Sequence, residues 1–92
     1  MTMQIADAFV DLRVIEFAQG VAAPYCGLLL GRNGADVIKV EPPVKGDWCR
    51  GLGLRKGDFS SEFIVLNRGK KSLALDMKSP DGRAAAFKLA SN

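Results

Sequence analysis

Apolar residues recur with strand spacing in two short stretches of the chain. Residues 12–18 place apolar side chains on both faces of an extended segment, which is typical of a sheet that is covered on both sides. Residues 36–41 form a second run rich in β-branched side chains. Pro42 ends this run because proline cannot donate to a strand ladder. The pattern therefore predicts two strands of a sheet with both faces covered.

The segment between these strands has the signals of a helix. Pro24 suits a first helical turn, because its missing N–H would have no helical partner there. An apolar run continues towards Arg32, and Gly34 supplies the stop because glycine tolerates the left-handed conformation of a helix C-cap. A crossover of this length makes the two strands parallel and the connection right-handed. The order strand, helix, strand predicts an α/β fold with a Rossmann-like parallel sheet and flanking helices.

The second half of the chain is predicted to add a long loop, a third strand and a second helix. Residues 44–62 contain four glycines, scattered charges and no sustained period, which is typical of a functional or mobile loop. Residues 63–66 are a short apolar run, after which the chain turns and residues 72–76 are predicted to form a strand. Ser79 can cap a helix that runs from Pro80 to the end of the chain.

Composition and size are those of one small globular domain. The chain has 92 residues, of which 48% are hydrophobic and 25% are charged, and a chain this short buries a smaller share of its surface than a full-length enzyme does. It contains no His, which removes the common imidazole base and the usual zinc spacings. We therefore expect no metal site. We interpret Cys26 and Cys49 as reduced thiols, and favour an unreactive, partly exposed Cys49 over a thiol activated by Arg50.

The N-terminal residues bear on the location of the protein. Asp7 and Asp11 stand where a secretory signal would carry positive charge and a long apolar run. The longest apolar stretch of the chain is much shorter than the roughly 20 residues of a membrane span. The sequence thus predicts a cytoplasmic protein.

Positive charge is concentrated in the second half of the chain, although the net charge is only +3. Residues 50–71 hold six basic side chains and two acidic ones. Such a bias suits a polyanionic ligand, but it is also typical of a solvated basic face, which charge alone favours. The glycines do not decide the question, because the chain has neither the GxGxxG spacing of dinucleotide binders nor the lysine of a P-loop.

Three stretches of sequence stand out as a set. They are residues 12–18 with Pro24, residues 34–43 with Gly46, Asp47 and Arg50, and residues 66–83, which read LNRGKKSLALDMKSPDGR. At these spacings the chain resembles the start of the CoA-transferase family III proteins. That family includes formyl-CoA and crotonobetainyl/carnitine CoA-transferases and the related α-methylacyl-CoA racemases. The resemblance covers residues 12–92.

The resemblance implies that residues 1–92 are the N-terminal, CoA-binding part of a larger Rossmann-like domain, which is incomplete in this chain. It implies a parent enzyme that moves CoA from an acyl-CoA to a carboxylic acid through an aspartyl-CoA thioester. The nucleophilic Asp of the family lies beyond residue 92, so we expect no catalytic residue in this chain and no turnover by it alone. CoA is then a substrate, and no tightly bound cofactor is expected. The parent is expected to be a homodimer, with neither nucleic acid nor membrane as a partner.

Two alternatives stay open. The parent can be an α-methylacyl-CoA racemase, whose acid/base pair would also lie beyond residue 92. The chain can instead be a non-catalytic CoA- or nucleotide-binding module, or an interaction fragment that pairs with a separately encoded remainder. A final helix without a stop signal favours a truncated chain, and strands with two apolar faces but few covering helices predict that such a fragment self-associates.

The resemblance also implies a candidate CoA site, which agrees with the chemistry of the residues. CoA carries phosphates and an adenine, so its site needs cations, exposed N–H groups and an apolar shelf. The predicted site residues are Val21, Ala22, Pro42, Leu66, Asn67, Arg68, Lys70 and Lys71.

The roles of these residues differ. The basic residues supply charge at the tight Gly69 turn, and Pro42 and Leu66 frame the adenine, with Pro42 in place of the Arg of certain relatives. The loop at Val21 opens the helix whose N-terminus faces CoA in the family. Asn67 is equally consistent with a turn former. We interpret Glu41 and Asp76 as structural residues and not as catalytic carboxylates.

Overall fold

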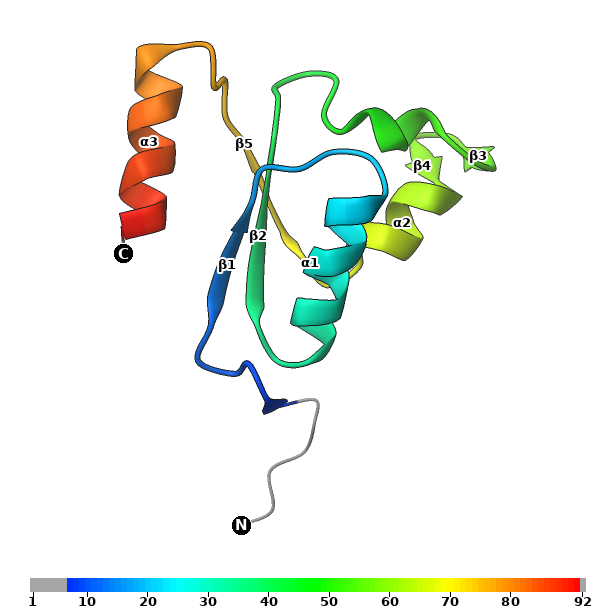
Figure 1. Cartoon of the computed structure of the whole chain (residues 1–92). Helices are drawn as coiled ribbons and strands as arrows, with labels where there is room; N and C mark the ends of the chain where they lie inside the picture. The colour runs from blue at the N-terminus through cyan, green and yellow to red at the C-terminus, as the bar shows by residue number, and fades with distance from the viewer. Residues whose placement is uncertain (1–6, 92) are drawn as a thin grey trace.

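A three-stranded parallel sheet forms the centre of the molecule (Figure 1). The computed structural model describes residues 7–91. The strands are β1 (Arg13–Glu16), β2 (Asp36–Glu41) and β5 (Lys71–Ala74), and β2 lies between the other two. The register pairs Glu16 with Lys39, and Lys39 with Ser72, in one row across the sheet. The predicted α/β class and parallel sheet are confirmed.

Helix α1 (Ala22–Arg32) connects β1 to β2. Pro24 lies in its first turn and is buried together with Gly27 and Leu28, so one face of the helix packs against the sheet. The helix ends where the sequence predicts, because Gly34 has a φ of 107°, a conformation that residues with a Cβ rarely adopt.

The second crossover contains more regular structure than a loop. Within residues 44–62 lie a 3-10 helix, η2 (Trp48–Gly51), and a small hairpin of β3 (Arg55–Lys56) and β4 (Phe59–Ser60). The apolar run at 63–66 belongs to helix α2 (Ser61–Asn67). Local capping explains both helices, because the Asp47 side chain accepts the Cys49 N–H and the Ser60 hydroxyl accepts the Phe63 N–H.

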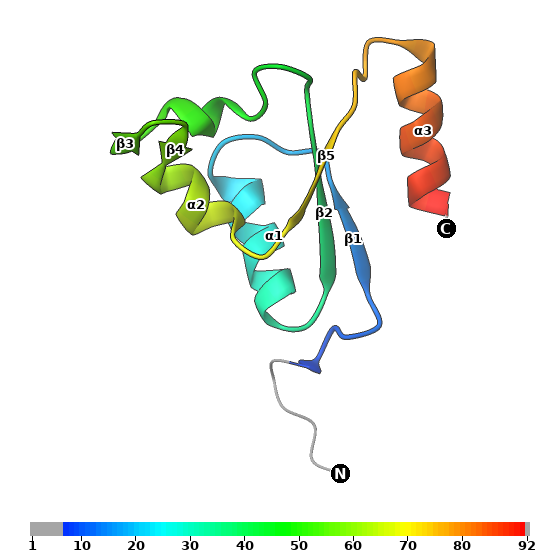
Figure 2. The same ribbon diagram turned by 180° about the vertical axis from the view of Figure 1, so that it is seen from behind.

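Helix α3 (Pro80–Ser91) follows β5, as predicted. The Ser79 hydroxyl caps it by accepting the Gly82 N–H at 2.9 Å. Figures 1 and 2 show α3 on one side of the sheet and α1 and α2 on the other. No helix within residues 7–91 is long and apolar enough to cross a membrane.

The core between the sheet and α1 combines apolar and charged side chains. Leu28, Val37 and Leu66 are buried here, whereas Val40 is buried on the opposite face of β2, because side chains alternate along a strand. Lys39 and Asp47 are among the most deeply buried side chains, at 2% and 0% exposure. Burial of charge is costly unless each group is paired. We therefore expect Lys39 and Asp47 to be held by partners inside the protein, next to the candidate site.

Candidate functional site

A groove of about 260 Å³ lies where the carboxyl ends of β2 and β5 meet the loop after β1. The Leu75 N–H donates to the Glu41 carbonyl at 3.0 Å, which continues the pairing of the two strands beyond their ends. This edge of an open parallel sheet is where α/β proteins bind ligands. The groove is lined by Phe17, Gln19, Val40, Glu41, Pro42, Leu75, Asp76, Met77 and Lys78.

The lining of the groove combines five apolar side chains with one amide, two carboxylates and one cation, Lys78. Phe17 and Met77 are 48% and 39% exposed, so their apolar surfaces are open to a ligand. Lys78 is exposed, and its backbone N–H donates to the Asp76 carboxylate at 3.0 Å. Apolar walls next to a lysine suit a flat base that carries phosphate.

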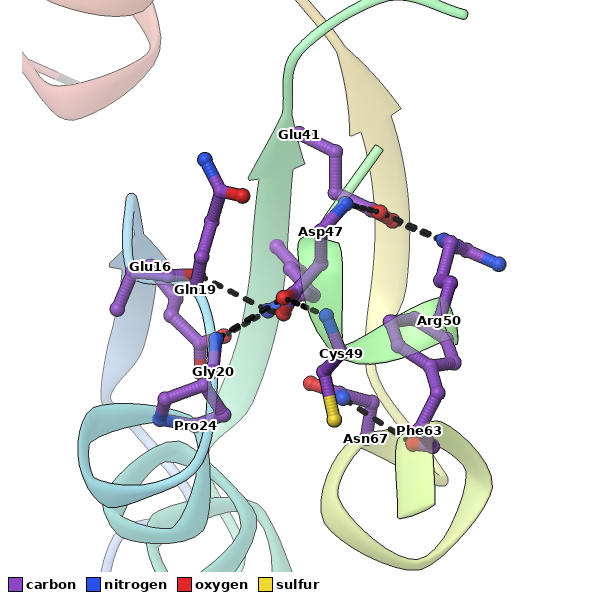
Figure 3. Close-up of polar contacts among 12 residues, drawn as sticks. Glu16, Gln19, Gly20, Pro24, Glu41, Asp47, Cys49, Arg50, Phe63 and Asn67 are labelled. Atoms are coloured by element: carbon purple, nitrogen blue, oxygen red, sulfur yellow. Dashed lines mark hydrogen bonds and ion pairs between the residues drawn. The ribbon is translucent and has the colours of Figure 1, made fainter. Parts of the chain in front are cut away.

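A buried network of charged side chains lies next to the groove (Figure 3). The Lys39 ammonium lies 2.8 Å from Glu16 Oε2 and 2.8 Å from Asp47 Oδ2. It also donates to the Ala18 carbonyl at 3.0 Å. The Lys70 ammonium lies 2.7 Å from Glu16 Oε1. Four charges from separate parts of the chain therefore meet in one cluster.

The environment shifts the pKa values of this cluster. Burial lowers the pKa of Lys39, but bonds to Asp47 and Glu16 outweigh burial and raise it. Burial raises the pKa of Asp47, but Lys39 and the N–H groups of Cys49 and Gly20 lower it overall. For Lys70, burial outweighs the bond to Glu16 and lowers the pKa. Lys39 and Asp47 are thus stabilised as an ion pair.

A second ion pair fixes the end of β2. Arg50 donates to both carboxylate oxygens of Glu41, at 2.7 and 2.8 Å, and its guanidinium lies 3.8 Å from the centre of the Phe63 ring. The bond from Arg50 lowers the pKa of Glu41. Because both oxygens of Glu41 are engaged, the geometry supports the structural interpretation of this residue.

Three of the predicted site residues lie near the carboxyl edge of the sheet. Val21 is the N-cap residue of α1 and is 51% exposed. Ala22 is the first residue of the helix, and no side chain caps this end. Pro42 lines the groove. The free N–H groups of the first helical turn and the apolar groove are therefore available at the same edge.

The other five predicted residues lie at the end of α2, in the turn that follows it and at the start of β5. Leu66 and Asn67 are buried, and the Asn67 amide donates to the Phe63 carbonyl at 3.1 Å. The Lys70 side chain is 3% exposed. Its ammonium also donates to the Pro24 carbonyl and to Asn67 Oδ1, so all three of its protons are engaged.

Arg68 and Lys71 remain exposed, but they point away from the groove. The Lys71 ammonium lies 3.1 Å from the Asp36 carboxylate at the beginning of β2. Arg68 and Arg32 line a separate hollow beside the last turn of α1. The three predicted cations therefore do not form one exposed cluster, because Lys70 is turned inward by the buried Glu16.

Sequence reasoning missed Leu75 and Lys78 as parts of the groove. Both residues follow β5, as Pro42 follows β2, so the rule that ligands bind at the carboxyl ends of strands was the available signal. The partly exposed Cys49 was a wrong prediction. Cys49 is fully buried because η2 turns it inward, and burial raises the pKa of its thiol. Within residues 7–91, no three His, Cys, Asp or Glu side chains gather to hold a metal ion.

Known CoA-transferases are similar to this chain. The succinyl-CoA–D-citramalate CoA-transferase of Chloroflexus aurantiacus is 45% identical over 80 residues, which cover 86% of this chain and 20% of that protein. The formyl-CoA:oxalate CoA-transferase of Rhodopseudomonas palustris is 45% identical over 74 residues, which cover 78% of this chain and 17% of that protein. The chain thus spans about a fifth of the length of these curated relatives.

Solved structures agree with the fold. A hypothetical protein of Mycobacterium tuberculosis superposes with a TM-score of 0.81 and 34% identity, over 95% of this chain and 24% of that one. A CAIB/BAIF family protein of Brucella suis superposes with a TM-score of 0.80 and 36% identity, over 89% of this chain and 23% of that one. The model of CoA-transferase family III matches residues 9–92. The chain therefore belongs to CoA-transferase family III.

Proposed function

We propose that this chain is the N-terminal part of an acyl-CoA:carboxylate CoA-transferase and that it binds the nucleotide end of CoA. The groove at the carboxyl edge of the sheet is the observation that carries the proposal. Phe17, Pro42 and Leu75 offer apolar surface to the adenine, and Lys78 offers a cation to phosphate. The uncapped start of α1 offers backbone N–H groups to the remaining phosphates.

In the proposed reaction, CoA moves from an acyl-CoA to a free carboxylate through a thioester on an Asp. That Asp is supplied from outside residues 1–92, and these residues contribute binding and orientation of CoA. CoA acts as a substrate and not as a bound cofactor. The enzyme works in the cytoplasm as a homodimer, without nucleic acid or membrane as a partner.

The proposal gives the predicted residues different roles. Val21, Ala22 and Pro42 face the ligand, whereas Leu66, Asn67 and Lys70 support α1 from behind. A role for Arg68 and Lys71 in binding CoA phosphates stays a prediction. Both are exposed near the amino-terminal ends of β2 and β5, whereas the groove lies at the carboxyl ends.

Transfer activity is tested with the full-length protein. Suitable substrate pairs are those of the related enzymes, which are succinyl-CoA with citramalate and formyl-CoA with oxalate. Mass spectrometry should detect exchange of CoA between the thioester and the free acid. Absence of both exchange and CoA binding would contradict the proposed function.

The site is tested by calorimetric titration of CoA into the full-length protein. Lys78→Ala should weaken CoA binding about fivefold, near 1 kcal/mol, because an exposed charge-assisted bond to phosphate is partly screened. Lys88→Ala, at the far end of α3, is the matched control and should leave binding unchanged. If Arg68→Ala with Lys71→Ala weakens binding and Lys78→Ala does not, the phosphates bind at the start of β5 instead.

A further inference from the structure

The backbone of the segment that enters η2 is held by three side chains. The Asp47 N–H donates to Glu41 Oε2 at 2.7 Å, the Trp48 N–H donates to Gln19 Oε1 at 3.2 Å, and the Cys49 N–H donates to Asp47 Oδ1 at 2.8 Å. Consecutive N–H groups of this segment are thus bound to acceptors from β2, from the loop after β1 and from the segment itself. We refer to residues 46–50 as the bridging segment.

Asp47 extends this bridge to the loop that precedes α1. Its Oδ1 also accepts the Gly20 N–H at 2.9 Å, and its Oδ2 forms the ion pair with Lys39. The carboxylate is fully buried, and Figure 3 shows it between Gly20 and Cys49. The indole ring of Trp48 lies directly over Gly20, where a Cβ would collide with it. The buried Asp47 carboxylate and the Trp48 indole ring therefore both hold this loop at Gly20.

The two structures joined by the bridging segment both belong to the groove. Gln19 lines it from the loop after β1, and Glu41 and Pro42 line it from the end of β2. A buried ion pair adds little net stability compared with apolar packing of the same volume. The contribution of Asp47 that apolar packing cannot replace is geometric, because it directs two backbone N–H groups to one oxygen.

We propose that Asp47 is a positioning residue for CoA, which holds the loop at residues 17–21, and with it the start of α1, at a fixed distance from Glu41 and Pro42. This inference rests on the proposed function. Asp47 is enclosed and does not reach the ligand itself, so it acts through Gly20. Displacing the loop would separate the free N–H groups of α1 from the apolar floor of the groove.

Two substitutions separate the positioning role from the charge. Asp47→Asn and Asp47→Ser both remove the negative charge beside Lys39, so both should lower the melting temperature. Asn keeps an oxygen at the same reach for the Gly20 and Cys49 N–H groups. The Ser hydroxyl can still cap Cys49, as Ser60 caps Phe63, but it is too short to reach Gly20. Asp58→Asn, on the exposed turn of the hairpin, is the matched control.

The test measures KM for acyl-CoA and kcat in the full-length enzyme. Asp47→Ser should raise KM about tenfold with kcat within about threefold, and Asp47→Asn should restore KM to within about threefold of wild type. A purely structural role would move the melting temperature in both variants and leave KM of the folded enzyme unchanged. That result would overturn the inference, as would equal KM values for the two variants.

Hydrogen exchange at the Gly20 amide keeps the test decisive if Asp47→Ser does not fold. In Asp47→Asn the amide should stay protected and KM should stay near the wild-type value. Loss of protection without a rise in KM would contradict the positioning role. Failure of the proposed function is distinguishable, because the wild-type enzyme would then show neither CoA transfer nor CoA binding.

Discussion

Lys39 and Asp47 occupy positions that an apolar pair of similar size would ordinarily fill. Lys39 lies in the central strand, where its neighbours Val37 and Val40 are buried apolar side chains. The ammonium keeps its proton because Asp47 and Glu16 together outweigh the cost of burial. Removing one partner would leave a buried charge uncompensated. The resulting loss of folding free energy is larger than the net stabilisation that the intact pair provides. We therefore expect the free energy of unfolding to depend on the protonation of these carboxylates at acidic pH.

Stability should fall as the pH drops below about 4.5. The folded-state pKa values of Asp47 and Glu41 lie below their ordinary values of 3.8 and 4.5. The unfolded chain therefore binds protons first, so the stabilisation is present above these values and is lost as pH falls through the lower folded-state values. Each pKa unit corresponds to about 1.4 kcal/mol. Urea denaturation of the full-length protein between pH 7 and pH 3 measures the effect.

The comparison variant is Asp47→Asn, which cannot titrate at this position. Its free energy of unfolding should be lower at pH 7 and should decline less steeply towards pH 3 than that of the wild type. Asp58→Asn should follow the wild-type curve. Parallel curves for wild type and Asp47→Asn would show that Asp47 does not contribute to the acid sensitivity.

The elements themselves were largely predictable from local signals. The bounds of β2 follow from a β-branched run that ends at Pro42, and the end of α1 follows from Gly34. The hairpin and α2 were not predicted, because their apolar positions are few and the start of α2 depends on the Ser60 cap.

In the candidate site, Pro42 was predicted to frame the adenine and lies in the groove. The partners of Lys39 could not be predicted, since Glu16 and Asp47 come from distant segments.

The junction between β5 and α3 sets one wall of the groove. A Cβ at Gly82 would collide with the Asp76 carbonyl, whereas a Cβ at Gly51 would meet nothing within 4 Å. Gly82→Ala should therefore lower the free energy of unfolding by about 1–2 kcal/mol, because overpacking outweighs the better helix propensity of Ala. It should also weaken CoA binding, since the segment from Asp76 to Lys78 must move. Gly51→Ala should change stability by less than about 0.5 kcal/mol.

Urea denaturation and calorimetric titration of both glycine variants provide the readout. An equal free energy of unfolding for Gly82→Ala and Gly51→Ala would mean that the contact at Asp76 yields without cost. In that case the position of Lys78 would not depend on the start of α3.

At the scale of the whole molecule, the two faces of the sheet are covered unequally. The face towards α1 and α2 is closed by the buried charges and apolar core, whereas α3 leaves a hollow of about 260 Å³ on the other face. The hollow is lined by Phe17, Met77, Ala86, Phe87 and Ala90. Phe87 is 75% exposed. Exposed apolar surface of this kind is typical of an interface.

Residues 1–92 expressed alone should therefore self-associate. Sedimentation at about 0.1 mM should show species larger than the monomer, because exposed apolar surface promotes association at micromolar to millimolar concentrations. Phe87→Asp should shift the population towards monomer. Phe59→Asp is the matched control, because Phe59 is 68% exposed but lies on the hairpin. A monomer at about 0.5 mM, or dissociation by Phe59→Asp alone, would contradict this prediction.

The contact between Lys70 and the Pro24 carbonyl spans 46 positions of the chain. During synthesis the ribosome releases residues in order, so Glu16, α1 and Lys39 all emerge before Lys70, the second cation that pairs with Glu16. Until then, docking of α1 would leave Glu16 paired with Lys39 alone and the Pro24 carbonyl without its donor. The contacts of the first crossover are thus completed only when the second has been made, because Lys70 supplies the last bonds between β1, α1 and the turn after α2.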